Sequence, residues 1–280
     1  AFGSFIMKPV VQGGVALSPY TLQLMNLAIE KEKPDFIVFT GDNIFGPAPS
    51  LLLSENNVKK SIAAFLQPVV ENGIPFAVVF GNHDSETVMS KEKQLQYYQT
   101  FPGCLVPDTS NTIGSRVGNY NLTVENKTGK ELLNLWFLDS GGSSINGYEF
   151  VTTGQIEWYE SESAKLKEKN GGEALPAFLF QHIPVPEIYS VLNEVDKETP
   201  GAVKGFGQYK NQYFVLDEEV LKEGSMNEAP CPPDFNNGQF DSWVRQGDIF
   251  GAVFVHYHVI YFVSTYRGIY LIYPPCGGFY

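Results

Sequence analysis

The sequence predicts a single α/β domain, and three observations support this fold class. Four short apolar runs have the length of buried strands, each run ends in polar residues, and helical patterns lie between them. The runs occupy residues 36–39, 76–80, 177–180 and 252–255. Apolar runs that alternate with helices are typical of βαβ units with parallel strands. At 280 residues and 43% hydrophobic content, the chain is long enough to bury one large core.

The N-terminal part begins with a βαβ unit. An apolar strand at 4–7 is joined to the strand at 36–39 by a helix whose Ser-Pro start places proline at the first helical position. A second helix is expected over residues 54–72, where apolar side chains recur at helical spacing. Because proline lacks an amide hydrogen, Pro68 should kink or interrupt the last turn of this helix.

The rest of the chain continues the pattern, with two irregular regions. Residues 102–118 are loop-rich, and residues 186–237 show little periodicity, which predicts a long lid-like excursion because long loops in compact domains are usually functional. No repeat or linker divides the chain, so one domain is expected over residues 1–280. Further helices are expected at 91–100, 154–169 and 239–245, an antiparallel hairpin at 120–124 and 132–138, and closing strands at 259–263 and 268–273.

Charge and composition exclude some classes of partner. The formal net charge of −12 argues against nucleic acid, because proteins that bind it present basic faces, but it leaves room for a small phosphorylated substrate. No apolar run approaches the roughly 20 residues that span a bilayer. The three cysteines fit neither a disulfide scaffold nor a cysteine-based zinc site.

Two glycosylation acceptor triplets bear on localisation. They begin at Asn121 and Asn126, five residues apart in the sequence. Such triplets are modified in proteins that enter the secretory pathway. The sequence therefore predicts a secreted or extracellular glycoprotein.

The polar residues that end the four strands carry the chemistry. Every histidine of the chain lies among them. Because ligands in α/β sheets bind outside the carboxyl ends of the strands, these side chains should meet at one edge. Carboxylate, amide and imidazole groups are suitable ligands for zinc, iron or manganese. The predicted metal site contains Asp42, Asn82, His182, His256 and His258.

The ordered motifs resemble the calcineurin-like metallophosphoesterase superfamily. They are Gly41-Asp42, Gly81-Asn82-His83-Asp84, Gln181-His182-Ile183-Pro184 and the His256-x-His258 pair. These motifs and the sequence of residues 36–46 are similar to the branch that contains the short, atypical purple acid phosphatases. This resemblance implies a four-layer α/β/β/α sandwich with two central mixed sheets. It also implies hydrolysis of phosphomonoesters through attack by a metal-bound hydroxide.

The resemblance also implies a role for each motif residue. Asp42 would bridge two metal ions, while Asn82, His182 and His256 would complete one site and His258 would serve the other. His83, oriented by Asp84, would stabilise the transition state or protonate the leaving alkoxide.

Two segments depart from the family pattern. The end of the first strand is Lys8-Pro9-Val10, where the family has Asp-x-His or an Asp with a later Tyr ligand. The last motif, at 255–261, lacks a glycine and three polar residues of the family pattern. We therefore expect one well-held ion, a second site with too few ligands, and the ammonium of Lys8 beside the vacated position. The alternative is a catalytically inactive, glycosylated extracellular protein that keeps the fold for structural or binding purposes.

Overall fold

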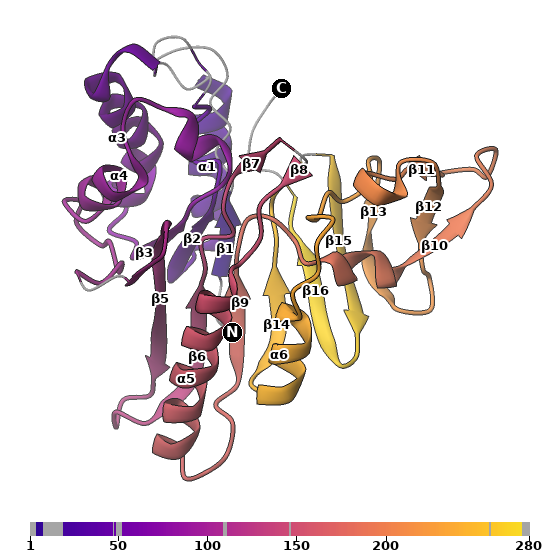
Figure 1. The fold of residues 1–280 in the computed structure, drawn as a ribbon. Helices are drawn as coiled ribbons and strands as arrows, with labels where there is room; N and C mark the ends of the chain where they lie inside the picture. Colours follow the sequence, from indigo (N-terminus) through magenta and orange to yellow (C-terminus); the bar gives the residue numbers. More distant parts are fainter. Residues whose placement is uncertain are drawn as a thin grey trace.

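The computed structural model shows two central sheets with helices on their outer faces (Figure 1). The four-layer α/β sandwich predicted from the sequence is confirmed. The larger sheet is mixed, and the three strands described in the smaller sheet run parallel. The structure describes residues 4–7, 19–46, 48, 52–108, 111–145, 147–257 and 259–275.

The smaller sheet carries the first two site motifs. Its strands lie in the order β1 (Ser4–Met7), β2 (Phe36–Thr40) and β3 (Phe76–Val79), and all neighbours are parallel. The predicted βαβ unit is thus confirmed. Helices α1 (Pro19–Glu32), α3 (Glu55–Glu71) and α4 (Lys91–Tyr98) lie on its outer side (Figure 1).

Pro68 lies inside α3 without ending it, so the predicted interruption is wrong. The proline removes one backbone hydrogen bond, a loss of order 3 kcal/mol in a helix interior. The neighbouring side chains of Phe65, Leu66 and Val69 are fully buried and hold this turn against the sheet. The side-chain amide of Asn72 also donates to the Pro68 carbonyl at 2.7 Å, which satisfies an acceptor at the helix end.

The larger sheet separates two hydrophobic cores. On β6 (Glu131–Phe137), Leu135 and Phe137 face the smaller sheet, whereas Trp136 faces the opposite core. Its eight strands follow the order β13-β15-β16-β14-β9-β6-β5-β4. The others are β4 (Asn111–Ile113), β5 (Arg116–Glu125), β9 (Ala177–Phe180), β13 (Leu221–Met226), β14 (Ile249–Val253), β15 (Ile260–Tyr266) and β16 (Ile269–Tyr273).

Helices α5 (Thr153–Lys169) and α6 (Gln239–Gln246) cover the second core (Figure 1). The predicted helices and the β5–β6 hairpin are confirmed. The loop-rich prediction for residues 102–118 is wrong in part, because β4 and the start of β5 lie there. No helix in the described ranges is long and apolar enough to cross a membrane.

The region 186–237 is more regular than its sequence indicates. It contains the 3-10 helices η2 (Pro186–Val191) and η3 (Gly207–Tyr209), and β13 joins the larger sheet. The region also contains a small side sheet formed by β10 (Leu192–Val195), β12 (Tyr213–Leu216) and β11 (Val203–Lys204). The strands of the region 186–237 are two to six residues long, which is too short to show a hydrophobic period. The partner of β13 is β15, which lies outside this region of the sequence.

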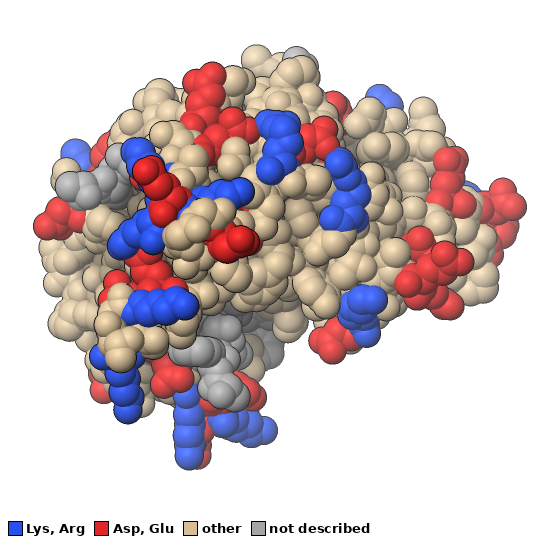
Figure 2. Space-filling view, turned by 90° about the horizontal axis from the view of Figure 1, so that it is seen from below, with Lys and Arg blue, Asp and Glu red and all other residues tan. Residues whose placement is uncertain are grey.

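Figure 2 shows one face of the molecule, on which basic and acidic side chains lie interspersed. Acidic side chains gather at the end of the molecule that carries the small side sheet. Exposed acidic residues of that region are Glu194, Asp196, Glu198, Glu218 and Glu219.

Candidate metal centre

The candidate site lies where β2 and β3 end beside β9 and β14. Asp42 is buried and adopts a left-handed backbone conformation with φ of 48°. Few residues other than glycine adopt this conformation, although aspartate tolerates it better than most, and it costs of order 1–3 kcal/mol. Such a backbone persists where the surrounding structure holds it, and here it follows directly on Gly41 at φ 95°.

Two glycines allow the loops that carry Asp42, Asn82 and His182 to lie close to one another. A Cβ on Gly41 would lie 2.7 Å from Nδ1 of His182, and a Cβ on Gly81 would lie 2.2 Å from Oδ1 of Asp42. Both distances are shorter than any real Cβ contact. Only glycine at these positions brings Asp42, Asn82 and His182 together.

His182 is the centre of the cluster and is fully buried. Its Nδ1 lies 3.1 Å from the carbonyl oxygen of Thr40, which can only accept, so Nδ1 carries a proton. In the neutral ring Nε2 then presents a lone pair. Nε2 lies 3.2 Å from Oδ2 of Asp42, 3.0 Å from Oδ1 of Asn82 and 3.0 Å from Nδ1 of His256.

The chemistry of this donor set fits a metal ion. Two oxygens and two imidazole nitrogens converge on one region, and each can offer a lone pair to a cation. Within the described part of the chain, Asp42, His182 and His256 form a buried group whose ligand atoms all lie within 4.8 Å of one another. A backbone carbonyl that fixes the tautomer of the central histidine is also typical of metal ligands. His258 and Lys8 lie outside the described residues.

His83 and Asp84 are placed differently from expectation. The His83 ring makes its contact with Glu86, where Nδ1 lies 2.5 Å from Oε2, so the expectation that Asp84 orients this ring is wrong. Instead Asp84 accepts backbone hydrogen bonds from Gly81 at 2.7 Å and Ile44 at 3.2 Å. It therefore ties the two strand-end loops together. The i, i+3 spacing in the short helix η1 (His83–Glu86) places Glu86 beside the histidine.

Asp84 is fully buried, and this burial raises its pKa to about 7, with the nearby charge of Asp42 adding to the effect. The backbone amides of Gly81 and Ile44 and the charge of Lys91 oppose the shift without cancelling it. The folded protein therefore holds the Asp84 proton over a range of pH in which the unfolded chain has lost it.

This shift predicts how stability depends on pH. Because the folded pKa lies above the unfolded value of 3.8, the contribution of Asp84 is complete below pH 3.8 and is lost as pH rises through about 7. In metal-free protein, the free energy of unfolding should therefore fall between pH 4 and 7 more steeply for wild type than for Asp84→Asn. Urea denaturation at several pH values measures the difference, and parallel curves for the two proteins would contradict it.

Asp139 forms a structural turn, as its position before Ser-Gly-Gly indicates. Its carboxylate accepts from Nζ of Lys91 at 2.9 Å and from the backbone amides of Val117 at 3.1 Å and Gly141 at 3.0 Å. The pair with Lys91 is nearly inaccessible to solvent. This carboxylate is fully engaged and lies outside the metal centre.

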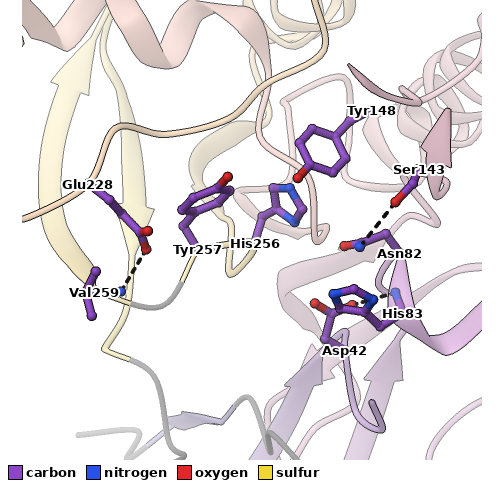
Figure 3. A pocket seen from close by; sticks show the side chains of 9 residues that line it. All are labelled: Asp42, Asn82, His83, Ser143, Tyr148, Glu228, His256, Tyr257 and Val259. Atoms are coloured by element: carbon purple, nitrogen blue, oxygen red, sulfur yellow. Dashed lines mark hydrogen bonds between the residues drawn. The ribbon is translucent and has the colours of Figure 1, made fainter. Parts of the chain in front are cut away.

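A cavity of about 400 Å³ opens onto the metal centre (Figure 3). Asp42, Asn82 and His83 lie on one side of it and His256 beside them. Sequence reasoning missed four lining residues, namely Ser143, Tyr148, Glu228 and Val259. The ring of Tyr148 meets His256 edge to face, with centroids 4.2 Å apart, and Tyr257 follows His256 in the chain.

The β7–β8 hairpin explains part of this lining. Strands β7 (Ser143–Ser144) and β8 (Gly147–Tyr148) place Ser143 and Tyr148 opposite each other, and Oγ of Ser143 lies 3.5 Å from Nδ2 of Asn82. Glu228 comes from the region 186–237, and its carboxylate accepts from the amide of Val259 at 2.9 Å. A glycine-rich turn before an aromatic residue is the weak sequence signal that could have indicated the hairpin.

The fold and site together define a metallophosphoesterase domain. The family profile described as calcineurin-like phosphoesterase matches residues 15–222. The chain belongs to the calcineurin-like phosphoesterase family. The predicted resemblance to its atypical purple acid phosphatase branch is also confirmed, because the chain is similar to curated proteins of that name.

Two of these relatives are from Arabidopsis thaliana. The chain is 30% identical to probable inactive purple acid phosphatase 14 and 31% identical to probable inactive purple acid phosphatase 29, over 93% and 92% of its length. It spans 62% and 63% of their lengths, less than two thirds of each. It is also 34% identical to the phosphatase DCR2 of Saccharomyces cerevisiae, over 69% of this chain and 33% of that protein.

A solved structure supports the fold. The crystal structure of a dimetal phosphatase from Danio rerio superposes with a TM-score of 0.61 and 12% identity, covering 98% of this chain and 87% of that one. At this identity the likeness concerns the fold alone.

Proposed function

We propose that this chain is a metal-dependent phosphoesterase that hydrolyses small phosphomonoesters with one tightly held metal ion. The observation that carries the proposal is the convergence of Asp42, Asn82, His182 and His256 at the base of an open cavity. Zinc, iron or manganese held there would supply Lewis-acid polarisation of a phosphoryl oxygen. Membership of the calcineurin-like phosphoesterase family supports a hydrolytic role for this site.

The side chains of this protein supply the remaining steps. His83 lines the cavity, and its backbone amide donates to Oδ1 of Asp42 at 2.9 Å, which fixes the carboxylate relative to the ring. Glu86 engages Nδ1 of His83, so Nε2 is the nitrogen that would hold the proton for the leaving alkoxide.

The test is hydrolysis of an aryl phosphate by zinc-, iron- and manganese-replenished protein, with bound metal measured by mass spectrometry. Asparagine can adopt the left-handed backbone of Asp42, so Asp42→Asn removes the charge without forcing a new conformation. Because the metal's contribution is several kcal/mol, we expect the rate to fall by at least about 100-fold. Asp241→Asn, at an exposed ion pair with Arg267, is the matched control and should behave as wild type.

Equal rates for wild type and Asp42→Asn would end the catalytic interpretation. A second candidate function, binding without hydrolysis, is favoured by the names of the two Arabidopsis relatives. Metal-loaded protein that binds a phosphate analogue but hydrolyses no ester would support that candidate instead.

Secretion remains a proposal that rests on the acceptor triplets. Asn126 lies exposed in the turn between β5 and β6, where a glycan would meet solvent. The side-chain amide of Asn121 is half-buried in β5 and lies 2.8 Å from that of Asn134. In protein made through a secretory pathway we expect a glycan at Asn126 alone. A mass shift on glycosidase treatment, absent in Asn126→Gln, would show it, and no shift in wild type would contradict it.

A further inference from the structure

A second cavity adjoins the metal centre. Its volume is about 420 Å³, within the range of small-molecule sites. The two cavities share Glu228 and Tyr257 as lining residues, so they are neighbours with a common wall. None of the candidate metal ligands in the described residues lines the second cavity. Its walls are residues 202–206, 227–229, Cys231 and Tyr257.

The walls of the second cavity combine apolar side chains with a few polar ones, among them Asn227. Ala202, Val203, Phe206, Ala229 and Cys231 line it, and of these Ala229 and Cys231 are buried. Burial raises the pKa of the Cys231 thiol to about 12, so this side chain contributes an apolar surface rather than a thiolate. The charged residues of the lining are Glu228 and the exposed Lys204.

The aromatic part of this wall is held in place. The backbone amide of Phe206 donates to the hydroxyl of Tyr189 at 2.9 Å, and the Phe206 ring packs against Tyr148, with centroids 5.5 Å apart. The Tyr257 ring packs against His256, with ring centroids 5.2 Å apart. A site whose side chains are fixed in this way loses little entropy when a ligand binds.

Glu228 restricts what can cross from one cavity to the other. Glu228 lines both cavities. Its carboxylate accepts from the amide of Val259 (Figure 3). A second phosphate at this position would meet a like charge, which disfavours diphosphates and nucleotides. An uncharged ring would meet the faces and edges of Phe206 and Tyr257, which favour another aromatic group.

We propose that the second cavity binds the alcohol portion of the substrate and selects phosphomonoesters whose alcohol carries an aromatic ring. The inference rests on the proposed function, since it assumes that the phosphoryl group lies at the metal centre. It assigns substrate selection to Phe206 and its neighbours, which belong to the irregular region 186–237 rather than to the family motifs.

The test compares two phosphonates that cannot be hydrolysed, measured by calorimetry on zinc-loaded protein. Wild type should bind (2-phenylethyl)phosphonate at least about tenfold more tightly than methylphosphonate, which is about 1.4 kcal/mol. Ala202→Phe fills the second cavity and should remove this preference while leaving methylphosphonate affinity unchanged. Phe206→Ala, which opens the wall instead, should reduce the preference as well. Ala164→Phe, on the exposed face of α5, is the matched control.

The outcomes separate the two proposals. Equal binding of both phosphonates by wild type would overturn this inference alone, as would a preference unchanged in both Ala202→Phe and Phe206→Ala. Failure of zinc-loaded wild type to bind either phosphonate would overturn the proposed function, and the inference with it. Because binding is measured, the result does not depend on turnover.

Discussion

Replacing His182 by alanine should remove the metal ion and lower hydrolysis by at least about 100-fold, since a catalytic metal supplies several kcal/mol. His182 touches Asp42, Asn82 and His256 within 3.2 Å through a single nitrogen. Its other nitrogen is anchored on the carbonyl oxygen of Thr40, which holds the ring in one orientation. We expect metal content to fall from one ion per chain to none at micromolar zinc.

His83→Ala is the matched control, because it removes a histidine from the same cavity but outside the ligand cluster. The backbone amide that donates to Asp42 is kept in this variant. It should retain the metal and lose turnover, most strongly for substrates with poor leaving groups, which need a proton most. Full metal content in His182→Ala, or loss of metal in His83→Ala, would show that the ligand set is assigned wrongly.

The convergence of the candidate ligands could be predicted because it depends on strand ends. Asp42, Asn82, His182 and His256 each follow a short apolar run, and the parallel strands β2 and β3, with β9 and β14, bring those ends to one place. Period and polarity are local features of a sequence. That the polar side chains meet at one edge of the sheet follows from the general geometry of α/β folds.

The partners of these side chains could not be predicted in the same way. Because Asp84 follows His83 in the sequence, it is expected to orient the His83 ring. In the structure a turn of 3-10 helix places Glu86 beside that ring. Asp84 instead accepts hydrogen bonds from the amides of Gly81 and Ile44. Glu228 reaches the cavity only because β13 pairs with β15 across a long sequence separation. Contacts of this kind depend on tertiary packing, and the hydrophobic pattern of a short strand does not show which distant segment it will contact.

Gly81→Ala should have the second large effect, because it acts on the loop that seats Asp42. An added Cβ would lie 2.2 Å from Oδ1 and 2.3 Å from the backbone nitrogen of Asp42. Overpacking of this kind costs about 1–3 kcal/mol when the backbone can shift. The shift would displace the carboxylate from His182, so zinc affinity should fall by about tenfold for each 1.4 kcal/mol of ligand strain.

Thermal unfolding of the metal-free protein and zinc titration measure these two effects separately. Gly154→Ala is the matched control, since its Cβ would meet Cγ2 of Ile113 at 3.3 Å and the first turn of α5 favours alanine over glycine. That variant should change neither the unfolding temperature by more than a few degrees nor zinc affinity. If Gly81→Ala were equally silent, the close approach of the Asp42 and Asn82 loops would not be what holds the metal centre together. The buried carboxylate of Asp84, which spans the same two loops, would then be the remaining candidate for that role.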